Sequence, residues 1–467
     1  MNLAGRPKSM KHLGYGFLVA WMAFSASAQN YTFDIRQTHA DGIYRAGEPV
    51  TFSVSLLENG EAAAGKGVRC IVYHDGREVK REDFPGQNKA QCVTSLEKPG
   101  WCQLTVVGLN PDKEPAQQMV EGKMKEILGY SGALVEPLKI QQGAPEPEDF
   151  DVFWAREKEK LRKIPMEAKT KPVPDAPDYL KISYVSVPVG SGFRPVEGVL
   201  KMPSGAKPKS LPVFLHVHGA GVHNPAAPAW QPPLPEGSVV KEPVIFMNLN
   251  AHGIPNDQPK EYYEGLRSGE LKGYPYLNSD NPEKSYLKGM VLRLARALEY
   301  LKSLPEWNGR DIIVSGGSQG GAQALIAAGI DPQVTLIYAD VPAMCDHGGT
   351  LSGRSTGWPK LYKKDADGTI RIAPDDRAEQ GGQSIVKTAG YFDAANFARR
   401  IQCPAVLRTG GWDGTCPPTS VFAAYNNMPS PNKRIFFFPQ GGHTQGIYKE
   451  TDQQKPARFV GMKQEDS

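Results

Sequence analysis

The chain of 467 residues has no hydrophobic run long enough to cross a membrane. Its one candidate, from Leu13 to Phe24, is shorter than the stretch of about 20 apolar residues that a membrane-spanning helix needs. Lysines precede this run and Ala26-Ser27-Ala28 follows it, which is typical of a secretory signal cleaved before Gln29. We expect residues 1–28 to be a signal peptide and the mature protein to be secreted or periplasmic, with no membrane association after cleavage; an uncleaved anchor is the alternative.

An excess of one charge is also missing. The chain carries 54 Lys and Arg against 50 Asp and Glu, a net charge of +4, with no long basic run. A nucleic-acid-binding surface would need such a run or patch, so we expect no nucleic-acid partner. Disorder as the main state is excluded because hydrophobic residues make 40% of the chain and charged residues 22%, an ordinary globular composition.

Cysteine is scarce, with six residues in the chain. No cysteine directly follows the expected cleavage site, so a bacterial lipid anchor is not expected there. Each half of the chain has an odd number of cysteines, which excludes a complete local disulfide framework. One disulfide and one thiol in each half would fit, and spacing alone does not give the pairing. The six are Cys70, Cys92, Cys102, Cys345, Cys403 and Cys416.

The first part of the chain has the pattern of short β-strands. From Tyr31 to about Leu138, apolar and polar residues alternate in short runs that turn pairs such as Asn59-Gly60 separate. This spacing predicts a small immunoglobulin-like β-sandwich, residues 29–138. A segment rich in Pro, Gln and Glu follows and predicts a linker, residues 139–148.

The pattern changes after the linker, and residues 149–467 predict an α/β domain with a mostly parallel sheet. Short apolar runs of the kind buried on both faces of a parallel sheet alternate with runs at helical spacing. The stretch 348–383 interrupts this alternation, so we expect a lid or a pocket wall there. The expected strands are 213–217, 244–247, 311–315, 334–338, 405–407 and 434–438, and the expected helices are 287–301, 322–328 and 419–426.

The run Gly316-Gly317-Ser318-Gln319-Gly320 lies between an expected strand and an expected helix. This is the context of a nucleophile elbow, a turn so tight that small residues must flank the serine. The turn would raise the Ser318 hydroxyl above the sheet and aim the backbone N–H of Gln319 at an oxyanion that forms during the reaction. The alternative is a glycine-rich turn that only joins the strand to the helix.

A serine nucleophile needs a neighbouring base, and the base needs an acid that holds its tautomer. With an elbow of this kind, the order along the chain is serine, acid, histidine. Asp413 follows one late strand, and His443 follows the next strand after a pair of glycines. We therefore predict Asp413 as the acid and His443 as the base. Asp340 and Asp346 are alternative acids, and a purely structural surface histidine is the alternative for His443.

The run His216-Val217-His218-Gly219-Ala220-Gly221 closes another expected strand. Its His-Gly turn predicts that the backbone N–H of Ala220 is the second donor of an oxyanion hole, beside that of Gln319. Histidines two residues apart share one face of a strand, so a zinc site at His216 and His218 is the alternative. No carboxylate or third ligand stands at motif spacing, and we expect no metal and no other cofactor.

Three segments carry a resemblance to a known family. They are Asp149-Phe150-Asp151-Val152-Phe153-Trp154, the elbow from Gly316 to Gly321, and the run Asp413-Gly414-Thr415-Cys416-Pro417-Pro418-Thr419 with its continuation Phe422-Ala423-Ala424-Tyr425-Asn426. With them the chain resembles the acetyl xylan esterase and cephalosporin-C deacetylase family, carbohydrate esterase family seven. The resemblance implies an α/β-hydrolase fold, a triad of Ser318, Asp413 and His443, and an oxyanion hole made by the backbones of Ala220 and Gln319.

Three positions depart from the usual pattern of that family. Its Asp-x-Arg-Gly-Gln-Gly motif reads Asn248-Leu249-Asn250-Ala251-His252-Gly253 here, Ala220 stands in place of a tyrosine, and Thr444 stands in place of the acid after the histidine. Because the donor at Ala220 is a backbone N–H, we expect the hole to survive and the acyl pocket to be wider. The shortest members resemble closed hexamers, but the added sandwich prevents a transfer of their assembly, so a homo-oligomer is left open.

We therefore expect an exported serine esterase that removes acetyl groups from carbohydrate hydroxyls, with acetylated oligo- or polysaccharides such as xylan as substrates. Candidate substrate-binding residues are Trp412, His252, Tyr274 and Trp358. A peptidase of the prolyl-oligopeptidase type is one alternative, although the chain lacks the N-terminal repeats of a propeller. A glycan-binding homologue that has lost its activity is the alternative from a different class.

The role of the predicted sandwich has two interpretations. It binds sugars if aromatic residues such as Trp101 and Tyr44 are exposed, or it braces the catalytic domain. Aromatic residues of a small sandwich usually belong to its core, which favours the brace.

Overall fold

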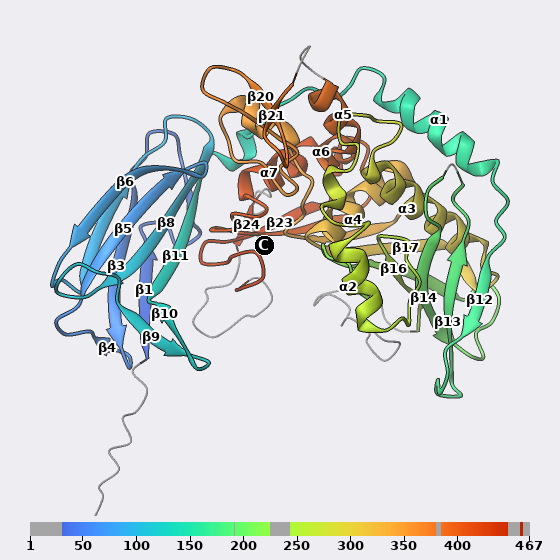
Figure 1. The fold of residues 1–467 in the computed structure, drawn as a ribbon, viewed down its shortest axis with the longest axis horizontal. Helices are drawn as coiled ribbons and strands as arrows, with labels where there is room; N and C mark the ends of the chain where they lie inside the picture. The colour runs from blue at the N-terminus through green and yellow to red at the C-terminus, as the bar shows by residue number, and fades with distance from the viewer. Residues whose placement is uncertain (1–29, 191, 225–242, 380–383, 447–457, 461–467) are drawn as a thin grey trace, which may run out of the picture.

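The computed structural model describes residues 30–190, 192–224, 243–379, 384–446 and 458–460. The expected signal peptide, residues 1–28, lies outside these ranges. No helix within them is both long and apolar enough to span a bilayer. Figure 1 shows a set of N-terminal β-strands at one end of the molecule, in blue, and a large sheet with helices at the other.

The N-terminal part consists mainly of two sheets, which we call the N-terminal sheets. One has four strands, with β1, β3 and β4 in order and β7 paired to β3, and the other has five strands in the order β2-β11-β8-β5-β6. Strands β9 and β10 form a separate hairpin. The bounds are β1 Tyr31–Gln37, β2 Ile43–Tyr44, β3 Val50–Glu58, β4 Glu61–Ala62, β5 Gly67–His74, β6 Arg77–Phe84, β7 Lys89–Thr94, β8 Gly100–Leu109, β9 Gln117–Val120, β10 Lys123–Glu126 and β11 Leu128–Val135.

The alternation of apolar and polar residues explains why these two sheets pack face to face. Every second residue from Val50 to Leu56 of β3 is buried, and these residues share one hydrophobic cluster with residues of the five-stranded sheet. The thiol of Cys70 on β5 is in hydrogen-bond contact with that of Cys92 on β7. All six cysteines are free thiols, so the structure joins none of them in a disulfide.

The second part contains one ten-stranded sheet in the order β12-β13-β14-β16-β15-β17-β18-β22-β23-β24. The strands from β16 to β23 in this order run parallel to one another, whereas β12 to β14 and β24 pair antiparallel at the flanks. The prediction was a mostly parallel α/β sheet, and the structure has a mixed α/β sheet in which only the central strands are parallel. Strands β12 to β14 and β24 were not predicted. The bounds are β12 Lys169–Pro172, β13 Leu180–Val187, β14 Val196–Pro203, β15 Leu211–Val217, β16 Ile245–Asn250, β17 Trp307–Gly317, β18 Leu336–Asp340, β22 Ala405–Gly410, β23 Lys433–Phe438 and β24 Arg458–Val460.

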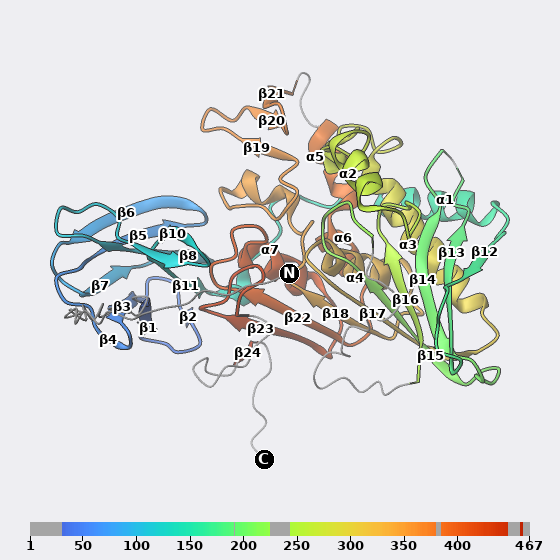
Figure 2. The ribbon, with the colours of Figure 1, turned by 60° about the horizontal axis from the view of Figure 1, so that its bottom comes forward.

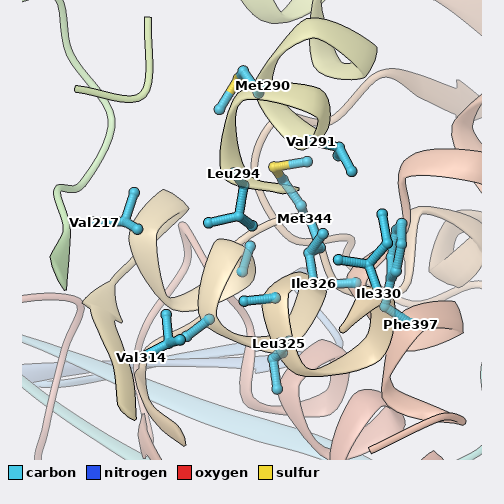
Figure 3. Close-up of a cluster of buried hydrophobic side chains, with 14 of the residues drawn as sticks. Val217, Met290, Val291, Leu294, Val314, Leu325, Ile326, Ile330, Met344 and Phe397 are labelled. Carbon is cyan, nitrogen blue, oxygen red and sulfur yellow. The ribbon is translucent and has the colours of Figure 1, made fainter. Parts of the chain in front are cut away.

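Helix α4 forms the centre of the layer that covers one face of this sheet. It packs against β15, β17 and β18 and is covered in turn by α3 and α6. Nearly all residues of α4 are apolar and buried, as expected for a helix that strands and other helices surround on all sides. Figure 3 shows Leu325 and Ile326 of α4 among side chains of the strands and of α3. The helices are α1 Phe150–Arg162, α2 Lys260–Ser268, α3 Tyr286–Ser303, α4 Gln319–Ile330, α5 Ser384–Phe392, α6 Ala394–Ala398 and α7 Pro418–Asn427, with 3-10 turns η1 Pro137–Lys139, η2 Tyr274–Tyr276 and η3 His347–Ser352.

The insertion expected at residues 348–383 has a small sheet of its own. Strands β19 (Tyr362–Lys364), β20 (Ile370–Ile372) and β21 (Arg377–Ala378) pair antiparallel in this order. The insertion reaches the loop after β22, because the backbone N–H of Trp358 donates a hydrogen bond to the carbonyl oxygen of Thr415 at 2.9 Å. A lid or a pocket wall stays a prediction for this insertion.

The segment from residue 140 to 148, between the two parts, contains no helix or strand. Side chains of the second part hold it in place. Asp346 Oδ1 accepts a hydrogen bond from the backbone N–H of Gly143 at 2.7 Å, and Arg400 forms an ion pair with Glu146 at 2.7 Å. The connection is therefore packed onto the second part along its length.

Candidate active site

Ser318 lies in a sharp turn between strand β17 and helix α4. Its backbone angles are φ 56° and ψ −118°, a conformation that a residue with a Cβ rarely adopts. The Ser318 N–H donates to the carbonyl oxygen of Asp340 at 2.9 Å, and its own carbonyl oxygen accepts from the N–H of Ala343 at 2.9 Å. The surrounding backbone thus holds a strained serine at the carboxyl end of a central strand, the geometry expected of a nucleophile elbow.

Glycines permit this turn because other backbone segments approach it closely. A Cβ at Gly320 would lie 2.0 Å from the carbonyl oxygen of Val217, and a Cβ at Gly316 would lie 2.4 Å from the carbonyl carbon of Gly320. A Cβ at Gly321 would lie 2.8 Å from the carbonyl oxygen of Asp340. The glycines of the motif are therefore required by the contact of the turn with β15 and β18.

The three side chains predicted as a triad lie next to one another. Ser318 Oγ is 3.0 Å from Nε2 of His443, and Nδ1 of His443 is 2.8 Å from Oδ2 of Asp413. An ionised carboxylate can only accept hydrogen bonds, so Nδ1 of His443 donates to Asp413 and Nε2 accepts from the serine hydroxyl. The Asp413 side chain is fully buried, whereas that of His443 is 24% exposed. A substrate can therefore reach the serine and histidine end of this chain of hydrogen bonds.

Backbone N–H groups fix the orientation of Asp413. Its Oδ1 accepts from the N–H of Thr415 at 2.9 Å and from that of Cys416 at 2.8 Å, which leaves Oδ2 directed at His443. The two glycines Gly441 and Gly442 before His443 are buried, and a Cβ at Gly442 would lie 2.5 Å from the ring of Trp412.

The alternative acids lie in other surroundings. Asp340 forms an ion pair with Arg408 at 3.4 Å, and Asp346 forms one with Arg354 at 2.6 Å. Burial raises the pKa of both carboxyls above the usual value for aspartate. Among the three candidate acids, the structure brings Asp413 to His443 and directs the other two at arginines.

The predicted oxyanion donors flank Ser318. Gln319 is the first residue of α4, where backbone N–H groups have no acceptor within the helix and the helix dipole is positive. The turn after β15 lies against the elbow, because a Cβ at Gly219 would be 3.5 Å from the carbonyl oxygen of Gly317 and 3.9 Å from Cβ of Ser318. Ala220 follows directly and is exposed. An oxyanion could thus be bound between the ends of β15 and α4.

His218 is engaged in holding this turn. Its Nδ1 donates to the carbonyl oxygen of Gly219 at 2.6 Å, and its Nε2 accepts from the N–H of Ala251 at 3.1 Å. Burial lowers the pKa of His218 to about 3, so the ring is neutral. His216 points elsewhere, with Nδ1 3.0 Å from Oγ of Ser315. These contacts use the ring nitrogens of His218 that a zinc site would need.

His252 also holds the turn after β15. It is fully buried, with Nε2 3.1 Å from the carbonyl oxygen of Gly221 and Nδ1 2.7 Å from the hydroxyl of Tyr286. Because the carbonyl oxygen only accepts, Nε2 donates to it and Nδ1 accepts from the tyrosine hydroxyl. Burial lowers the pKa of His252 well below the usual value. Tyr286 was not predicted as a functional residue, because it is the first residue of an ordinary buried helix.

The other candidate substrate-binding residues separate into two groups. The Tyr274 hydroxyl donates to Oε1 of Gln319 at 2.5 Å, and its ring centroid lies 4.5 Å from that of His252 and 6.0 Å from that of Trp358. These three therefore form one aromatic cluster beside the elbow. Trp412 is not part of it: its ring stacks on Tyr130 of β11, with centroids 4.4 Å apart.

One group of side chains in the described ranges has the spacing of metal ligands. Donor atoms of Asp413, Cys416 and His443 all lie within 4.8 Å of one another. Two of these residues are already hydrogen-bonded to each other. Burial raises the pKa of the Cys416 thiol well above the usual value, and a protonated thiol is a poor metal ligand. The donor set therefore suits a hydrogen-bonded triad better than a metal ion.

Comparisons with known proteins agree with this geometry. The family model described as acetyl xylan esterase (AXE1) matches residues 134–460. The chain is 27% identical to the acetyl esterase Axe7A of Xylanibacter ruminicola over 435 residues, which cover 90% of each protein. The match to that relative thus extends well into the N-terminal sheets.

Solved structures are similar to this chain over about two thirds of its length. An acetyl xylan esterase from Paenibacillus sp. R4 has a TM-score of 0.53 and 26% identity, and the match covers 66% of this chain and 93% of that one. Acetyl xylan esterase 1 from Thermoanaerobacterium sp. JW/SL YS485 has a TM-score of 0.53 and 22% identity, over 67% of this chain and 94% of that one. The mixed α/β sheet is thus of the α/β-hydrolase type. With a family model that matches most of its length, the chain belongs to the acetyl xylan esterase family and is a carboxylic-ester hydrolase.

Proposed function

We propose that the protein is an exported serine esterase that removes acetyl groups from carbohydrate hydroxyls, with Ser318, His443 and Asp413 as its catalytic triad. The observation that carries this proposal is the continuous chain of hydrogen bonds from Ser318 Oγ through both ring nitrogens of His443 to Asp413. The names of the relatives support acetyl esters as substrates and xylan as one acetylated polysaccharide.

The first half of the reaction transfers the acyl group to the enzyme. Nε2 of His443 removes the proton as Ser318 Oγ attacks the acyl carbonyl carbon, and the buried Asp413 carboxylate stabilises the imidazolium that results. The backbone N–H groups of Gln319 and Ala220 stabilise the negative charge on the carbonyl oxygen. The imidazolium then returns its proton to the sugar oxygen, which leaves as an alcohol with the acyl group remaining on Ser318.

The second half releases the acyl group. Water takes the place of the sugar, His443 accepts a proton from it, and the resulting hydroxide attacks the acyl carbonyl. The same two N–H groups stabilise the second oxyanion, and His443 then protonates Ser318 Oγ as acetic acid leaves, which ionises to acetate in solution. The residues of this chain supply every proton transfer in the cycle.

Residues around the oxyanion hole have supporting roles in this proposal. His252 and Tyr286 hold the turn that carries Ala220, and Tyr274 holds the side chain of Gln319. Trp358 and Tyr274 form an aromatic wall of the proposed substrate site, on the side of the insertion 348–383. His252 is fully buried, so it acts on the substrate site through the backbone of the turn.

The acyl range is the finer part of this proposal. By the family resemblance, Ala220 stands where a tyrosine is usual. In this proposal the smaller side chain leaves a pocket that accepts propionyl and butyryl groups as well as acetyl. Each methylene in an apolar pocket changes the transition-state energy by only about 1–3 kcal/mol, so one side chain is enough to set the preference.

The experiment measures kcat/KM for acetyl, propionyl and butyryl esters of one alcohol, followed by acetate release from acetylated xylo-oligosaccharides. Ser318→Ala is the control and should lose activity by several orders of magnitude on every ester. Retention of more than about a tenth of the activity by Ser318→Ala would contradict the triad. A wild type that rejects butyryl by more than about a hundredfold, with no change in Ala220→Tyr, would contradict the role of Ala220.

The same proposal assigns the remaining regions. The N-terminal sheets are an immunoglobulin-like domain, residues 29–138, joined by the linker 139–148 to the catalytic domain, residues 149–467; the two sheets with one shared core support this. Residues 1–28 are a signal peptide. N-terminal sequencing of the exported protein should find Gln29 first, whereas a retained Met1 would contradict cleavage.

A further inference from the structure

The loops that carry Asp413 and His443 contact the N-terminal sheets directly. We call residues 411–416, after β22, the acid loop, and residues 439–446, after β23, the base loop. Figure 2 shows β22 and β23 on the side of the large sheet that faces β8 and β11. Nearly all of the N-terminal sheets lie outside the matched family model, which begins at residue 134.

Trp101 of β8 reaches out of the N-terminal sheets into the second part. Its indole N–H donates to the carbonyl oxygen of Gly411 at 2.6 Å, a contact between residues 310 positions apart. The side chain is 1% exposed and belongs to the hydrophobic cluster of the large sheet rather than to that of the N-terminal sheets. Trp101 therefore fixes the acid loop two residues before Asp413, and its burial excludes a role as an exposed sugar platform.

Strand β11 contacts both loops through one face. Successive side chains of a strand point to opposite faces, so Tyr130 and Gly132 share a face. Tyr130 stacks on Trp412 of the acid loop, and the N–H of Gly132 donates to the carbonyl oxygen of Pro439 at 2.8 Å. A Cβ at Gly132 would lie 1.6 Å from the carbonyl oxygen of Gly411. The strand and the acid loop are thus in backbone contact.

The base loop has its own contacts with the four-stranded sheet, and the two loops bind each other. Nε2 of Gln440 donates to the carbonyl oxygen of Ile35 on β1 at 2.6 Å. The backbone N–H of Trp412 donates to the carbonyl oxygen of Gly441 at 3.0 Å, and the indole N–H of Trp412 donates to that of Gln440 at 2.8 Å. The two loops are therefore joined to each other as well as to the N-terminal sheets.

We infer that the N-terminal sheets position the acid and the base of the triad, and that Trp101 and Gly132 are positioning residues for the esterase reaction. This inference rests on the proposed function. It assigns the N-terminal sheets a role in the chemical step, which a passive neighbour or a separate sugar-binding module would not have.

The central test is Gly132→Ala, which forces a Cβ against Gly411 and displaces the acid loop. Since misplacement of a catalytic group by about 1 Å can cost on the order of 100-fold in rate, kcat should fall by roughly 10- to 100-fold while KM stays near the wild-type value. The acid limb of the pH profile of kcat/KM should also move, because a displaced carboxylate no longer interacts with the imidazolium in the same way.

Gly129→Ala is the matched control, since it lies on the same strand with its Cβ on the opposite face. That Cβ would lie 2.8 Å from Phe33 and Val106, inside the N-terminal sheets and away from both loops. It should lower the unfolding temperature and leave kcat and the pH profile as in the wild type. Trp101→Phe keeps most of the ring but removes the N–H donor, and it should lower kcat without a change in KM; it carries the test if Gly132→Ala does not fold.

Each outcome has a distinct meaning. Wild-type kcat and pH profile in folded Gly132→Ala or Trp101→Phe, or equal losses in Gly132→Ala and Gly129→Ala, would overturn the positioning role. Activity retained by Ser318→Ala in the same assay would instead overturn the proposed function on which the inference rests.

Discussion

Ser318 and its two partners are held by different parts of the molecule. The serine is fixed by contacts within one strand, one turn and one helix, and by contacts with the adjoining strands of the large sheet. Glycines allow these backbones to meet. Asp413 and His443 stand on loops that contact the N-terminal sheets through Trp101, Gly132 and Gln440. The nucleophile is thus a local feature of the sheet, whereas the acid and base depend on segments about 300 residues away in sequence, as the 310-residue separation of Trp101 and Gly411 shows.

This difference predicts that a substitution in the elbow has the largest effect on folding and activity. Gly320→Ala places a Cβ 2.0 Å from the carbonyl oxygen of Val217, so β15 and α4 must separate. We expect loss of folded protein, or activity reduced by at least about 100-fold, in circular dichroism and ester hydrolysis. Gly265→Ala in helix α2 is the matched control, because a Cβ there meets nothing within 4 Å and alanine favours a helix by up to about 1 kcal/mol. Equal behaviour of the two variants would contradict the close-packed elbow.

The acid should be the next most sensitive position. Asp413→Asn keeps the shape of the side chain but removes the charge that holds the imidazole tautomer, so kcat should fall on the order of 10³-fold or more. Asp340→Asn, which alters an ion pair with Arg408, should retain most of the activity. Steady-state kinetics on one acetyl ester compares them, and the reverse ranking would move the acid to the end of β18.

A smaller effect is expected on stability at acid pH. Burial lowers the pKa of His218 to about 3 from 6.5, so between these values the unfolded chain binds one more proton than the folded one. The free energy of unfolding should therefore fall as the pH drops below about 6.5, by up to about 1.4 kcal/mol per pH unit from this group.

His218→Asn removes this dependence. Urea unfolding at several pH values should find the variant less stable than the wild type at pH 7, with the difference narrowing toward pH 4. The difference in the free energy of unfolding should stay constant from pH 7 to 8, because His218 is then neutral in both the folded and the unfolded wild type. This range serves as the internal control. Parallel stability curves at all pH values would show that His218 is not buried as a neutral ring.

The contrast between the two halves of the site also explains what the sequence could predict. The elbow was predictable because Gly316 to Gly320 and the flanking apolar runs form one continuous segment, and because a tight turn needs small residues around its serine. The acid was left with three candidates, because each of them stands at or after the end of a late strand. Only the paths of the chain beyond these strands direct one of them at His443.

Other features had no local signal. Strand β12 is fully exposed and carries no apolar alternation, and Tyr286 resembles any tyrosine at a helix start. The contacts of Trp101 and Gly132 with Gly411 cross between segments whose approach depends on how the two parts of the chain pack. Aromatic and glycine residues in a strand are typical of a core, so their contacts with the acid loop could not be inferred from the pattern.

Covalent labelling tests the central claim, the triad at Ser318, most directly. A serine-directed phosphonate should inactivate the wild type and label it in a one-to-one ratio, with the label on the peptide that contains Ser318. Label on another residue, or full esterase activity after Ser318 has been labelled, would contradict the account.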